Sequence, residues 1–305
     1  MAKPRIAVTM GDPAGIGPEI CSKALLSPEV QKIADCILIG DKRFIKENIP
    51  MVDLKNADPK KIKIGINSKA AGQASFEYLM KAIELVKTGK ADAIATAPIN
   101  KKSIQMAGHK FQGHTEILAK YTNTKKYAML FVSDIFWVAL ATIHIPFNHV
   151  SKSLNRKKLF ELIQMVDDAS IKYRKIKPRI AVSGLNPHAG ESGIFGKEEI
   201  TTITPAVNDA IKAGIDVKGP ISPDAVFHLA RSGMFDIVIA MYHDQGLIPL
   251  KLLAFGKCVN VTIGLPFVRT SVDHGTGFDI AGMNVANPKS LIQAIKVAAL
   301  FSGKK

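Results

Sequence analysis

The sequence predicts an α/β protein with a mixed, mostly parallel sheet, and three features of the chain lead to that prediction. Short apolar runs typical of buried strands alternate with amphipathic stretches typical of helices. Several of these runs end in glycine, proline or polar residues, as buried strands of a parallel sheet do. The 305 residues, 47% of them hydrophobic, suffice for one large or two ordinary domains with their own cores.

The expected elements follow in chain order. Strands are expected at six runs: RIAVTM (5–10), CILIG (36–40), AIATAPI (93–99), RIAVSGL (179–185), IVIAMY (237–242) and VNVTIGL (259–265). Helices are expected over 70–88, 151–173, 197–213 and 290–302. The run YAMLFVSDIFWVALATIHI (127–145) contains two strand-like halves joined at Ser133 and Asp134. It predicts an antiparallel hairpin within an otherwise wound sheet.

The stretch 151–173 shows the helical pattern most clearly, with lysines around one apolar stripe. That stripe is formed by Leu154, Leu159, Phe160, Ile163 and Val166. No linker, repeat or low-complexity segment interrupts the chain. Two domains would therefore be joined by crossing strands, with a cleft between them. We expect a first domain of residues 1–125 plus 255–305 that encloses a second domain of residues 126–254.

The formal net charge of +15 makes a basic nucleic-acid-binding protein one alternative function. The lysines are scattered over helical faces, however, and aromatic and basic residues do not alternate, so we expect no nucleic-acid partner. A positive field also attracts small phosphorylated anions. No apolar run approaches the roughly 18 residues that cross a bilayer, and the start MAKPRIAVTMGDP does not resemble a signal peptide. These features predict a cytoplasmic protein with no membrane partner.

Three histidines stand just after strand-like runs: His144 in ATIHIP, His188 in GLNPHAGE and His243 in MYHDQG. Ligands of open α/β sheets bind at the carboxyl ends of strands. Three imidazoles and a water molecule would form an open catalytic site for zinc or a related divalent ion. Ordinary hydrogen-bonded turn histidines remain the alternative, because no two of the three show i, i+4 spacing. The thiols of Cys21, Cys36 and Cys258 lack metal-ligand spacing, and we expect them to be reduced core residues.

The segment VNVTIGLPFVRTSVDHGTGFDIAGMNVANP (259–288) follows a strand with Arg269, polar residues and glycines. It predicts an anion-binding loop, since the planar guanidinium suits phosphate or carboxylate and glycines let backbone amides approach the anion. A glycine-rich connector with a surface arginine is the alternative. The stretch GDPAGIGPEI (11–20) opens a helix, but its glycine spacing differs from the dinucleotide fingerprint, and no P-loop motif occurs.

Seven blocks of the chain, taken in order, resemble the 4-hydroxythreonine-4-phosphate dehydrogenase family: MGDPAGIGPE, TAPINK, GHTE, LNPHAGE, GPISPD, YHDQGLIPLK and GLPFVRTSVDHGT. The resemblance spans nearly the whole chain. It implies the fold of isocitrate and isopropylmalate dehydrogenases, with two α/β/α domains and a homodimer whose shared active sites lie in the interdomain cleft at the dimer interface. The second domain would carry the metal ligands and the dimer contacts.

The reaction that the resemblance implies is NAD(P)-dependent oxidation of 4-phosphooxy-L-threonine. The product, 2-amino-3-oxo-4-phosphooxybutanoate, loses carbon dioxide to give 3-amino-2-oxopropyl phosphate for pyridoxal 5'-phosphate biosynthesis. One divalent ion per site, Zn, Mg or Co, would polarise the substrate hydroxyl and stabilise the enolate.

The resemblance also implies a role for individual residues. The expected metal ligands are His144, His188 and His243. Substrate contacts are expected from His114, Thr115, Lys251, Asn260 and Arg269. The candidate acid, base or supporting groups are Asp224, Asp244 and Lys251.

A more distant resemblance concerns the cofactor. GDPAGIGPE is similar to the GDGIGPE of isopropylmalate dehydrogenases, and HGTGFDIAGMNVANP to their HGSAPDIAGKGIANP. It implies that the first domain binds the adenosine half of NAD through His274, Gly275, Thr276, Asp279 and Asn287. Asp279 would bind the ribose hydroxyls and favour NAD over NADP.

The sequence departs from the family pattern at a few positions. Ala97 and Asn100 stand where glycine and histidine are expected, Ile194 or Phe195 replaces a histidine, and Gly277-Phe278 replaces Ala-Leu. None of these positions belongs to the histidine triad. They leave the substrate open, because paralogous dehydrogenases of phosphorylated threonate or erythronate share the same metal and phosphate motifs.

Overall fold

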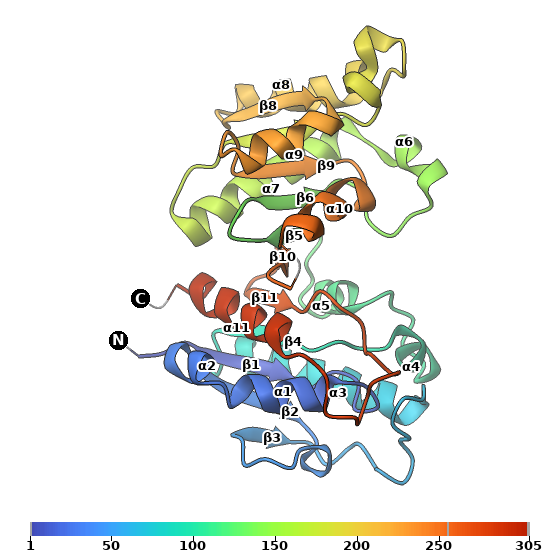
Figure 1. Ribbon diagram of the computed structural model, residues 1–305, viewed down its shortest axis with the longest axis vertical. Helices are drawn as coiled ribbons and strands as arrows, with labels where there is room; N and C mark the ends of the chain where they lie inside the picture. Colours follow the sequence, from blue (N-terminus) through green and yellow to red (C-terminus); the bar gives the residue numbers. More distant parts are fainter. Residues whose placement is uncertain (1, 255, 304–305) are drawn as a thin grey trace. The chain divides into compact units, whose positions relative to one another are not determined.

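The computed structural model describes residues 2–254 and 256–303. The chain forms two compact units, which are labelled by element in Figure 1. Unit 1 comprises Met1–Lys126 and Val259–Lys305, and unit 2 comprises Tyr127–Cys258. From the sequence we expected the chain to pass from one domain to the other after residue 125 and again after residue 254. Each unit is described by itself below.

Unit 1 contains a mixed sheet with the strand order β3-β2-β1-β4-β11-β10. Its strands are β1 (Arg5–Thr9), β2 (Asp35–Gly40), β3 (Met51–Asp53), β4 (Ala93–Thr96), β10 (Val259–Ile263) and β11 (Val268–Ser271). Neighbouring strands pair in parallel except β10 and β11, which are antiparallel. The central strands β1 and β4 are almost entirely buried, which explains why their sequences read as continuous apolar runs.

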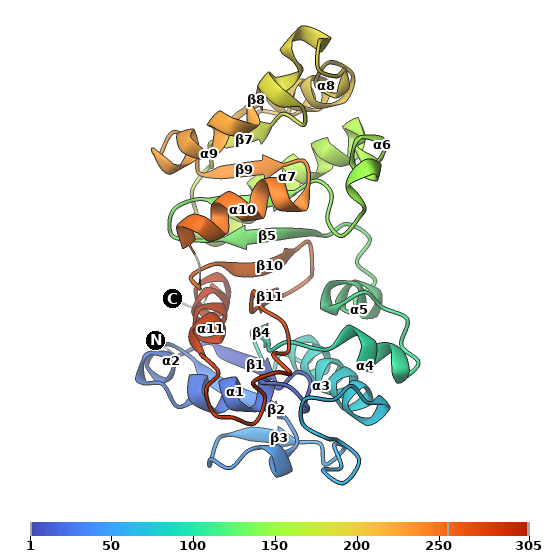
Figure 2. The same cartoon turned by 45° about the vertical axis from the view of Figure 1, so that its right-hand side comes forward.

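Helices cover both faces of this sheet, as Figure 2 shows for α1 and α3. The helices of unit 1 are α1 (Gly17–Leu25), α2 (Pro28–Ile33), the short 3-10 helix η1 (Lys42–Phe44), α3 (Lys69–Lys87), α4 (Lys101–Met106), α5 (His114–Tyr121) and α11 (Lys289–Phe301). Helices α1, α2 and α11 contact one another, and α3 packs with α4. The Ser68 hydroxyl starts α3 by accepting a hydrogen bond from Ala71 N at 3.1 Å.

The strands of unit 2 have the order β5-β6-β9-β7-β8 and include both parallel and antiparallel pairs. They are β5 (Ala128–Val132), β6 (Trp137–Leu140), β7 (Ile180–Ser183), β8 (Val217–Ile221) and β9 (Ile237–Ala240). β5 and β6 form the antiparallel hairpin expected from the sequence, and the remaining pairs are parallel. Ser133 closes that hairpin, because its hydroxyl donates to Phe136 O at 2.7 Å.

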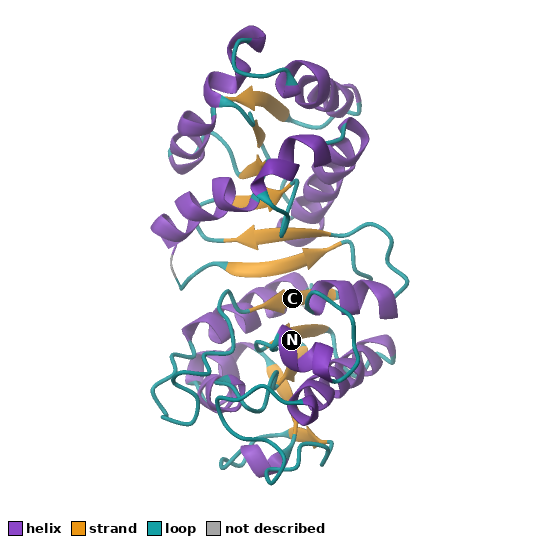
Figure 3. Cartoon of the chain, turned by 90° about the vertical axis from the view of Figure 1, so that its right-hand side faces the viewer, coloured by secondary structure: helices purple, strands orange, loops and turns teal. Residues whose placement is uncertain are grey.

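The helices of unit 2 flank its strands on both sides (Figure 3). They are the 3-10 helix η2 (Phe147–His149), α6 (Val150–Ser153), α7 (Arg156–Arg174), the turn η3 (Pro187–Gly193), the π-helical turn η4 (Glu199–Ile203), α8 (Thr204–Lys212), α9 (Pro223–Arg231) and α10 (His243–Ala254). Helix α7 packs with α8, whereas α9 and α10 pack against β9.

The single helix expected over 151–173 is divided in two. Leu154 is extended, and the Asn155 side chain accepts a hydrogen bond from Lys158 N, so α6 ends at Ser153 and α7 begins at Arg156. Within the predicted stripe, Leu159, Ile163 and Val166 are buried, while Leu154 and Phe160 are partly buried. Among the described residues, no helix combines the length and the apolar character that a membrane span requires.

Candidate active site

The most unusual charged group of unit 1 is Arg269. It is only 2% exposed and lies in the middle of β11, not in the loop that the sequence analysis predicted. Its Nη1 donates to Thr262 Oγ1 at 2.9 Å and its Nη2 to Thr96 Oγ1 at 2.8 Å, while Nε has no partner within the described ranges. Burial lowers the pKa of Arg269 to about 9, so the side chain stays charged at neutral pH.

The sheet register places the partners of Arg269. β10 and β11 pair with Asn260 opposite Ser271 and Val261 opposite Thr270. Continuing this antiparallel register sets Thr262 opposite Arg269. On the other side of β11, the end of β4 supplies Thr96, which pairs with Ser271. The two strands beside β11 thus each place one neutral hydroxyl group against the guanidinium.

Two more enclosed polar atoms near Arg269 have no hydrogen-bond partner among the described residues. They are Nε2 of His114, at the start of α5, and Oδ1 of Asn260, which lies two residues before Thr262 and so shares its face of β10. Burial lowers the pKa of His114 well below its usual value, and the charge of Arg269 lowers it further. Thr115 Oγ1 lies 3.5 Å from Thr262 Oγ1.

These residues therefore form a buried, cationic cluster with unused hydrogen-bonding capacity. No carboxylate of the described residues forms an ion pair with Arg269. A charge taken out of water normally has an oppositely charged partner. The cluster contains four of the five residues expected to contact substrate, and the fifth, Lys251, lies half-buried in α10 of unit 2.

In unit 2, two of the three predicted metal ligands lie side by side. His144 follows β6 and His243 begins α10 after β9, and the two parallel strands pair with Leu140 opposite Ala240. The ring centroids of the two histidines are 5.7 Å apart. His243 Nδ1 lies 2.6 Å from Asp244 Oδ1. A carboxylate on one ring nitrogen is the usual support for a histidine that binds metal through the other.

His188 does not join this pair within one chain. Among residues 2–254 and 256–303, no group of three His, Cys, Asp or Glu side chains is arranged to hold a metal ion. The expectation that strand ends bring all three histidines together is therefore not met in the single chain. The turn η3 carries His188 away from the end of β7 toward α9, near enough to Asp224 for their charges to interact.

The candidate acid and base groups of unit 2 occupy different environments. Asp224 lies in the first turn of α9, where its Oδ1 accepts a 2.5 Å hydrogen bond from Ser222 Oγ. This bond lowers the pKa of Asp224, and the nearby His188 lowers it further, so the carboxylate is ionised at neutral pH but is a weaker base than a free aspartate. Asp244 is exposed and holds His243.

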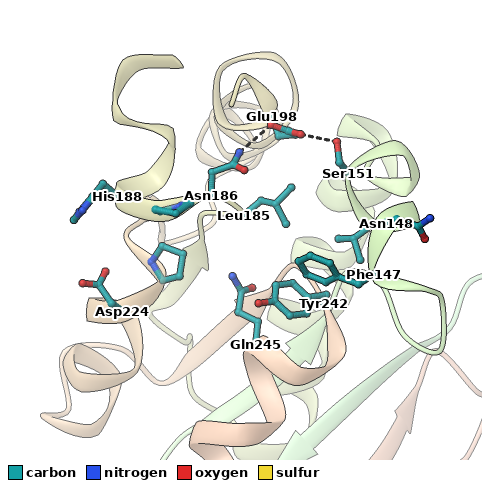
Figure 4. Close-up of a pocket in the computed structure, with 13 residues that line it drawn as sticks. Phe147, Asn148, Ser151, Leu185, Asn186, His188, Glu198, Asp224, Tyr242 and Gln245 are labelled. Atoms are coloured by element: carbon teal, nitrogen blue, oxygen red, sulfur yellow. Dashed lines mark hydrogen bonds between the residues drawn. The ribbon is translucent and has the colours of Figure 1, made fainter. Parts of the chain in front are cut away.

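A pocket of about 740 Å³ opens beside His188 and Asp224 (Figure 4). Its lining residues are Phe147, Asn148, Val150, Ser151, Leu185, Asn186, Pro187, His188, Glu198, Pro223, Asp224, Tyr242 and Gln245. In Figure 4, Glu198 accepts hydrogen bonds from Ser151 and Asn186. The Phe147 ring packs edge-on against Tyr242, with centroids 5.3 Å apart. The pocket combines an apolar wall with converging polar groups, as ligand sites do.

The loop expected to bind adenosine lies against the first turn of unit 1. Thr276 O accepts a hydrogen bond from Ile16 N at 2.9 Å. A Cβ at Gly15 would come within 2.6 Å of the same carbonyl, so the close approach requires glycine there. Gly277 has a φ of +52°, and a Cβ there would come within 3.0 Å of the Ile16 side chain. The left-handed backbone and the nearby Ile16 side chain therefore explain why glycine, and not the expected alanine, stands at position 277.

The other predicted cofactor residues differ in how they are held. His274 Nδ1 lies 2.9 Å from Gly275 O, and Asp279 is exposed. The Asn287 side chain accepts a hydrogen bond from Lys289 N at 3.0 Å, just before α11. Asn287 thus has a local structural role, whereas the Asp279 carboxylate faces solvent.

The fold and these clusters define an α/β protein of two units, each with candidate ligand-binding residues. Structural similarity at low identity supports the fold: isocitrate dehydrogenase from Methylococcus capsulatus matches with a TM-score of 0.51 at 16% identity, over 95% of this chain and 83% of that one. A family model described as "Pyridoxal phosphate biosynthetic protein PdxA" matches residues 7–298. The chain belongs to the PdxA family.

Individual relatives agree with this assignment. The 4-hydroxythreonine-4-phosphate dehydrogenase of Desulforapulum autotrophicum is 42% identical over 98% of this chain and 95% of its own length. The D-threonate 4-phosphate dehydrogenase of Pectobacterium atrosepticum is 45% identical over 96% and 98%. A crystal structure of 4-hydroxythreonine-4-phosphate dehydrogenase from Klebsiella pneumoniae matches with a TM-score of 0.90 at 39% identity, over 98% of this chain and 100% of that chain. All three relatives are dehydrogenases, which is the class of enzyme that this chain belongs to.

Sequence reasoning missed two groups around these residues. Thr96 and Thr262 hold Arg269, and the alternation of Asn260 and Thr262 in VNVTIGL is the signal that could have identified a polar face on β10. Glu199, which contacts the segment before His188, was missed because no local pattern in GKEEI distinguishes a buried glutamate from an exposed one.

Proposed function

We propose that this chain oxidises a hydroxyl group of a four-carbon phosphorylated hydroxy acid with a nicotinamide cofactor. The first candidate substrate is 4-phosphooxy-L-threonine. Its oxidation gives 2-amino-3-oxo-4-phosphooxybutanoate, which decarboxylates to 3-amino-2-oxopropyl phosphate, a step in pyridoxal 5'-phosphate biosynthesis. The observation that carries the proposal is the buried guanidinium of Arg269, which pairs with no carboxylate of the described residues.

Arg269 and its neighbours fit a phosphate or carboxylate group. The unpartnered Arg269 Nε can donate to an anionic oxygen, and charge-assisted bonds of this kind are about twice as strong as neutral ones. His114 stays neutral at physiological pH, so its ring offers one N–H donor without adding a second buried charge. The unpartnered Asn260 Oδ1 is an acceptor, so it can bind a hydroxyl or ammonium group of the substrate. The substrate would thus provide the missing negative charge.

The chemistry requires a hydride acceptor and a base. The hydride leaves the substrate carbon for the nicotinamide ring, the hydroxyl proton goes to a basic group of the protein, and the resulting β-keto acid then releases carbon dioxide. We propose Asp224 as one candidate for the base, because its carboxylate is ionised and lines the pocket beside His188, although the hydrogen bond from Ser222 makes it a weaker base. Asp244 and Lys251 are the alternatives.

We propose that a divalent ion binds at His144 and His243, with His188 of the partner subunit as the third ligand. The adjacent imidazoles and the Asp244 carboxylate on His243 Nδ1 support this arrangement. The absence of a three-residue group in the described part of one chain favours a site completed by a homodimer. When bound, such an ion acts as a Lewis acid toward a substrate oxygen.

A second substrate has specific support. The relative from Pectobacterium atrosepticum, at 45% identity, is named for D-threonate 4-phosphate. Both substrates carry a phosphate and a carboxylate, so the cluster around Arg269 would accept either. They differ in the group beside the carboxylate, an amine in one and a hydroxyl in the other. D-Threonate 4-phosphate is therefore the alternative substrate.

A substrate panel tests the proposal. The purified protein with Zn²⁺, Mg²⁺ or Co²⁺ would be given 4-phosphooxy-L-threonine, D-threonate 4-phosphate, D-erythronate 4-phosphate and their dephosphorylated forms. We expect NADH formation with one phosphorylated acid, release of carbon dioxide, and no turnover without the phosphate. Equal rates with and without the phosphate would contradict the role given to Arg269. Absence of NADH formation with every acid would refute the proposed function.

The cofactor preference gives a separate prediction. We propose that the exposed carboxylate of Asp279 accepts hydrogen bonds from the ribose hydroxyls and repels a 2′-phosphate. The wild type should then prefer NAD, and Asp279→Ser should shift kcat/KM toward NADP. Steady-state kinetics with both cofactors measure the ratio, and Asp168→Ser, at an exposed position of α7, serves as the control. An unchanged ratio in the Asp279 variant would show that the ribose is held elsewhere.

A further inference from the structure

Glu199 is the most deeply buried acid of unit 2. It is 2% exposed and begins the π-helical turn η4, a type of turn that often marks functional sites. Its Oε1 accepts hydrogen bonds from the backbone N–H groups of Leu185 and Asn186, both at 2.8 Å, and its Oε2 accepts one from Asn186 Nδ2 at 2.9 Å. No basic side chain of the described residues bonds to it. Every donor to this carboxylate therefore belongs to the segment that leads to His188.

That segment then enters a turn with an unfavourable backbone. Five consecutive residues of η3 have left-handed φ angles, and four of them are not glycine. They are His188 (52°), Ala189 (52°), Gly190 (81°), Glu191 (41°) and Ser192 (55°). L-residues avoid this region, because Cβ approaches the following carbonyl oxygen. Such a conformation persists only where surrounding contacts hold it.

The carboxylate of Glu199 binds the residues before this turn and lies close to Gly190 within it. A Cβ added at Gly190 would lie 2.6 Å from Glu199 Oε2, and one at Gly184 would lie 3.2 Å from Oε1. The backbone thus approaches both carboxylate oxygens of Glu199, at Gly184 before His188 and at Gly190 after it. Asn186 connects this arrangement to the pocket, because its amide also donates to Glu198 (Figure 4).

We propose that Glu199 is a positioning residue that fixes the left-handed turn 187–193 and thereby the direction of the His188 imidazole. This inference rests on the metal-binding role proposed for His188. Glu199 touches neither metal nor substrate, and it acts through the backbone of the turn. Loss of the hydrogen bonds that the Glu199 carboxylate accepts should therefore weaken metal binding more than it weakens the fold.

Glu199→Gln tests this inference with little change in size. The amide places an NH₂ donor against either the two backbone N–H groups or the Asn186 amide, so at least one bond is lost. Apo-protein would be titrated with Co²⁺ and followed by its absorption spectrum, which reports ligand geometry, alongside thermal unfolding. We expect the Kd for Co²⁺ to rise about 10–100-fold, the range for residues that orient metal ligands. Asp209→Asn, which neutralises a partly exposed acid of α8 bonded to Arg156, should bind Co²⁺ as the wild type does.

The outcomes separate this inference from the proposed function. If the wild type binds no Co²⁺, the metal site itself is wrong. If wild type and Asp209→Asn bind it and folded Glu199→Gln binds it with the same Kd and spectrum, Glu199 is only structural. Should Glu199→Gln fail to fold, Asn186→Ala decides, since it removes the side-chain hydrogen bonds to Glu199 and Glu198 and leaves the two backbone bonds to Glu199. A several-fold weaker Kd for Asn186→Ala would support the inference, and an unchanged Kd would overturn it.

Discussion

Replacing His243 with alanine is expected to remove both metal binding and turnover while unit 2 stays folded. The His243 side chain is 40% exposed at the start of α10, so its loss leaves no cavity in the core. Its imidazole lies beside His144, and Asp244 supports it through Nδ1. Loss of a direct ligand should cost more than the 10–100-fold that follows the loss of a supporting group. Metal content, circular dichroism and steady-state kinetics measure the three effects.

The control for this prediction is His228→Ala. His228 is an exposed histidine of α9, and its loss should change neither metal content nor rate. If the His243 variant retained stoichiometric metal and normal turnover, the ligand assignment would fail. If it lost secondary structure as well, the His144→Ala variant would provide a second test of the same pair, because His144 follows a different strand.

Mixing experiments can test whether two subunits share the metal site. Subunits of His188→Ala and His243→Ala, each inactive alone, would be allowed to exchange. A heterodimer of the two would carry both substitutions at one site and none at the other, if His188 comes from the partner subunit. Activity should then reappear on mixing, up to about a quarter of the wild-type value for random exchange, since half of the dimers would hold one intact site. No recovery despite proven exchange would place all three histidines in one subunit.

The sequence predicted the fold well where local pattern and tertiary environment agree. Buried parallel strands such as β1 and β9 read as apolar runs because both faces are covered. The hairpin at Ser133 was also recognisable and is confirmed. Strands β3, β8 and β11 were missed, since β3 is short, β8 is partly exposed and β11 reads VRTS without an apolar run. Boundaries set by side-chain caps, such as Asn155 before α7, were missed as well.

The candidate site was less predictable, because its geometry depends on contacts far apart in the sequence. Arg269 was expected on a loop, since VRTS contains one charged and two polar residues. Its burial requires hydroxyl groups from Thr96 and Thr262, and Thr96 is 173 positions away along the chain. The turn that directs His188 depends on Glu199, and no sequence period reveals a left-handed turn of ordinary residues.

Arg269→Lys should reduce kcat/KM for the phosphorylated substrate far more than an exchange of equal charge normally does. The guanidinium bonds to two hydroxyl groups and keeps Nε available, a planar arrangement that one ammonium group cannot reproduce. A hydrogen bond to a charged group contributes about 1.5–3 kcal/mol. The loss in kcat/KM should therefore be roughly 10–150-fold. Arg5→Lys, at a partly exposed arginine of the same unit, is the matched control and should have little effect.

Arg269→Met separates binding from stability, because the ligand-free protein holds a buried charge that forms no ion pair with a carboxylate of the described residues, although the Glu116 charge raises its pKa against the effect of burial. Methionine is apolar and similar in length, and replacing buried charged groups by apolar ones is often neutral or stabilising by about 1–4 kcal/mol. The variant should thus keep or raise the Tm of the ligand-free protein, yet lose the increase in Tm that the phosphorylated substrate gives the wild type. Thermal unfolding with and without substrate measures both. A lower Tm together with an unchanged substrate-induced shift would mean that Arg269 stabilises the sheet and that the anion binds elsewhere.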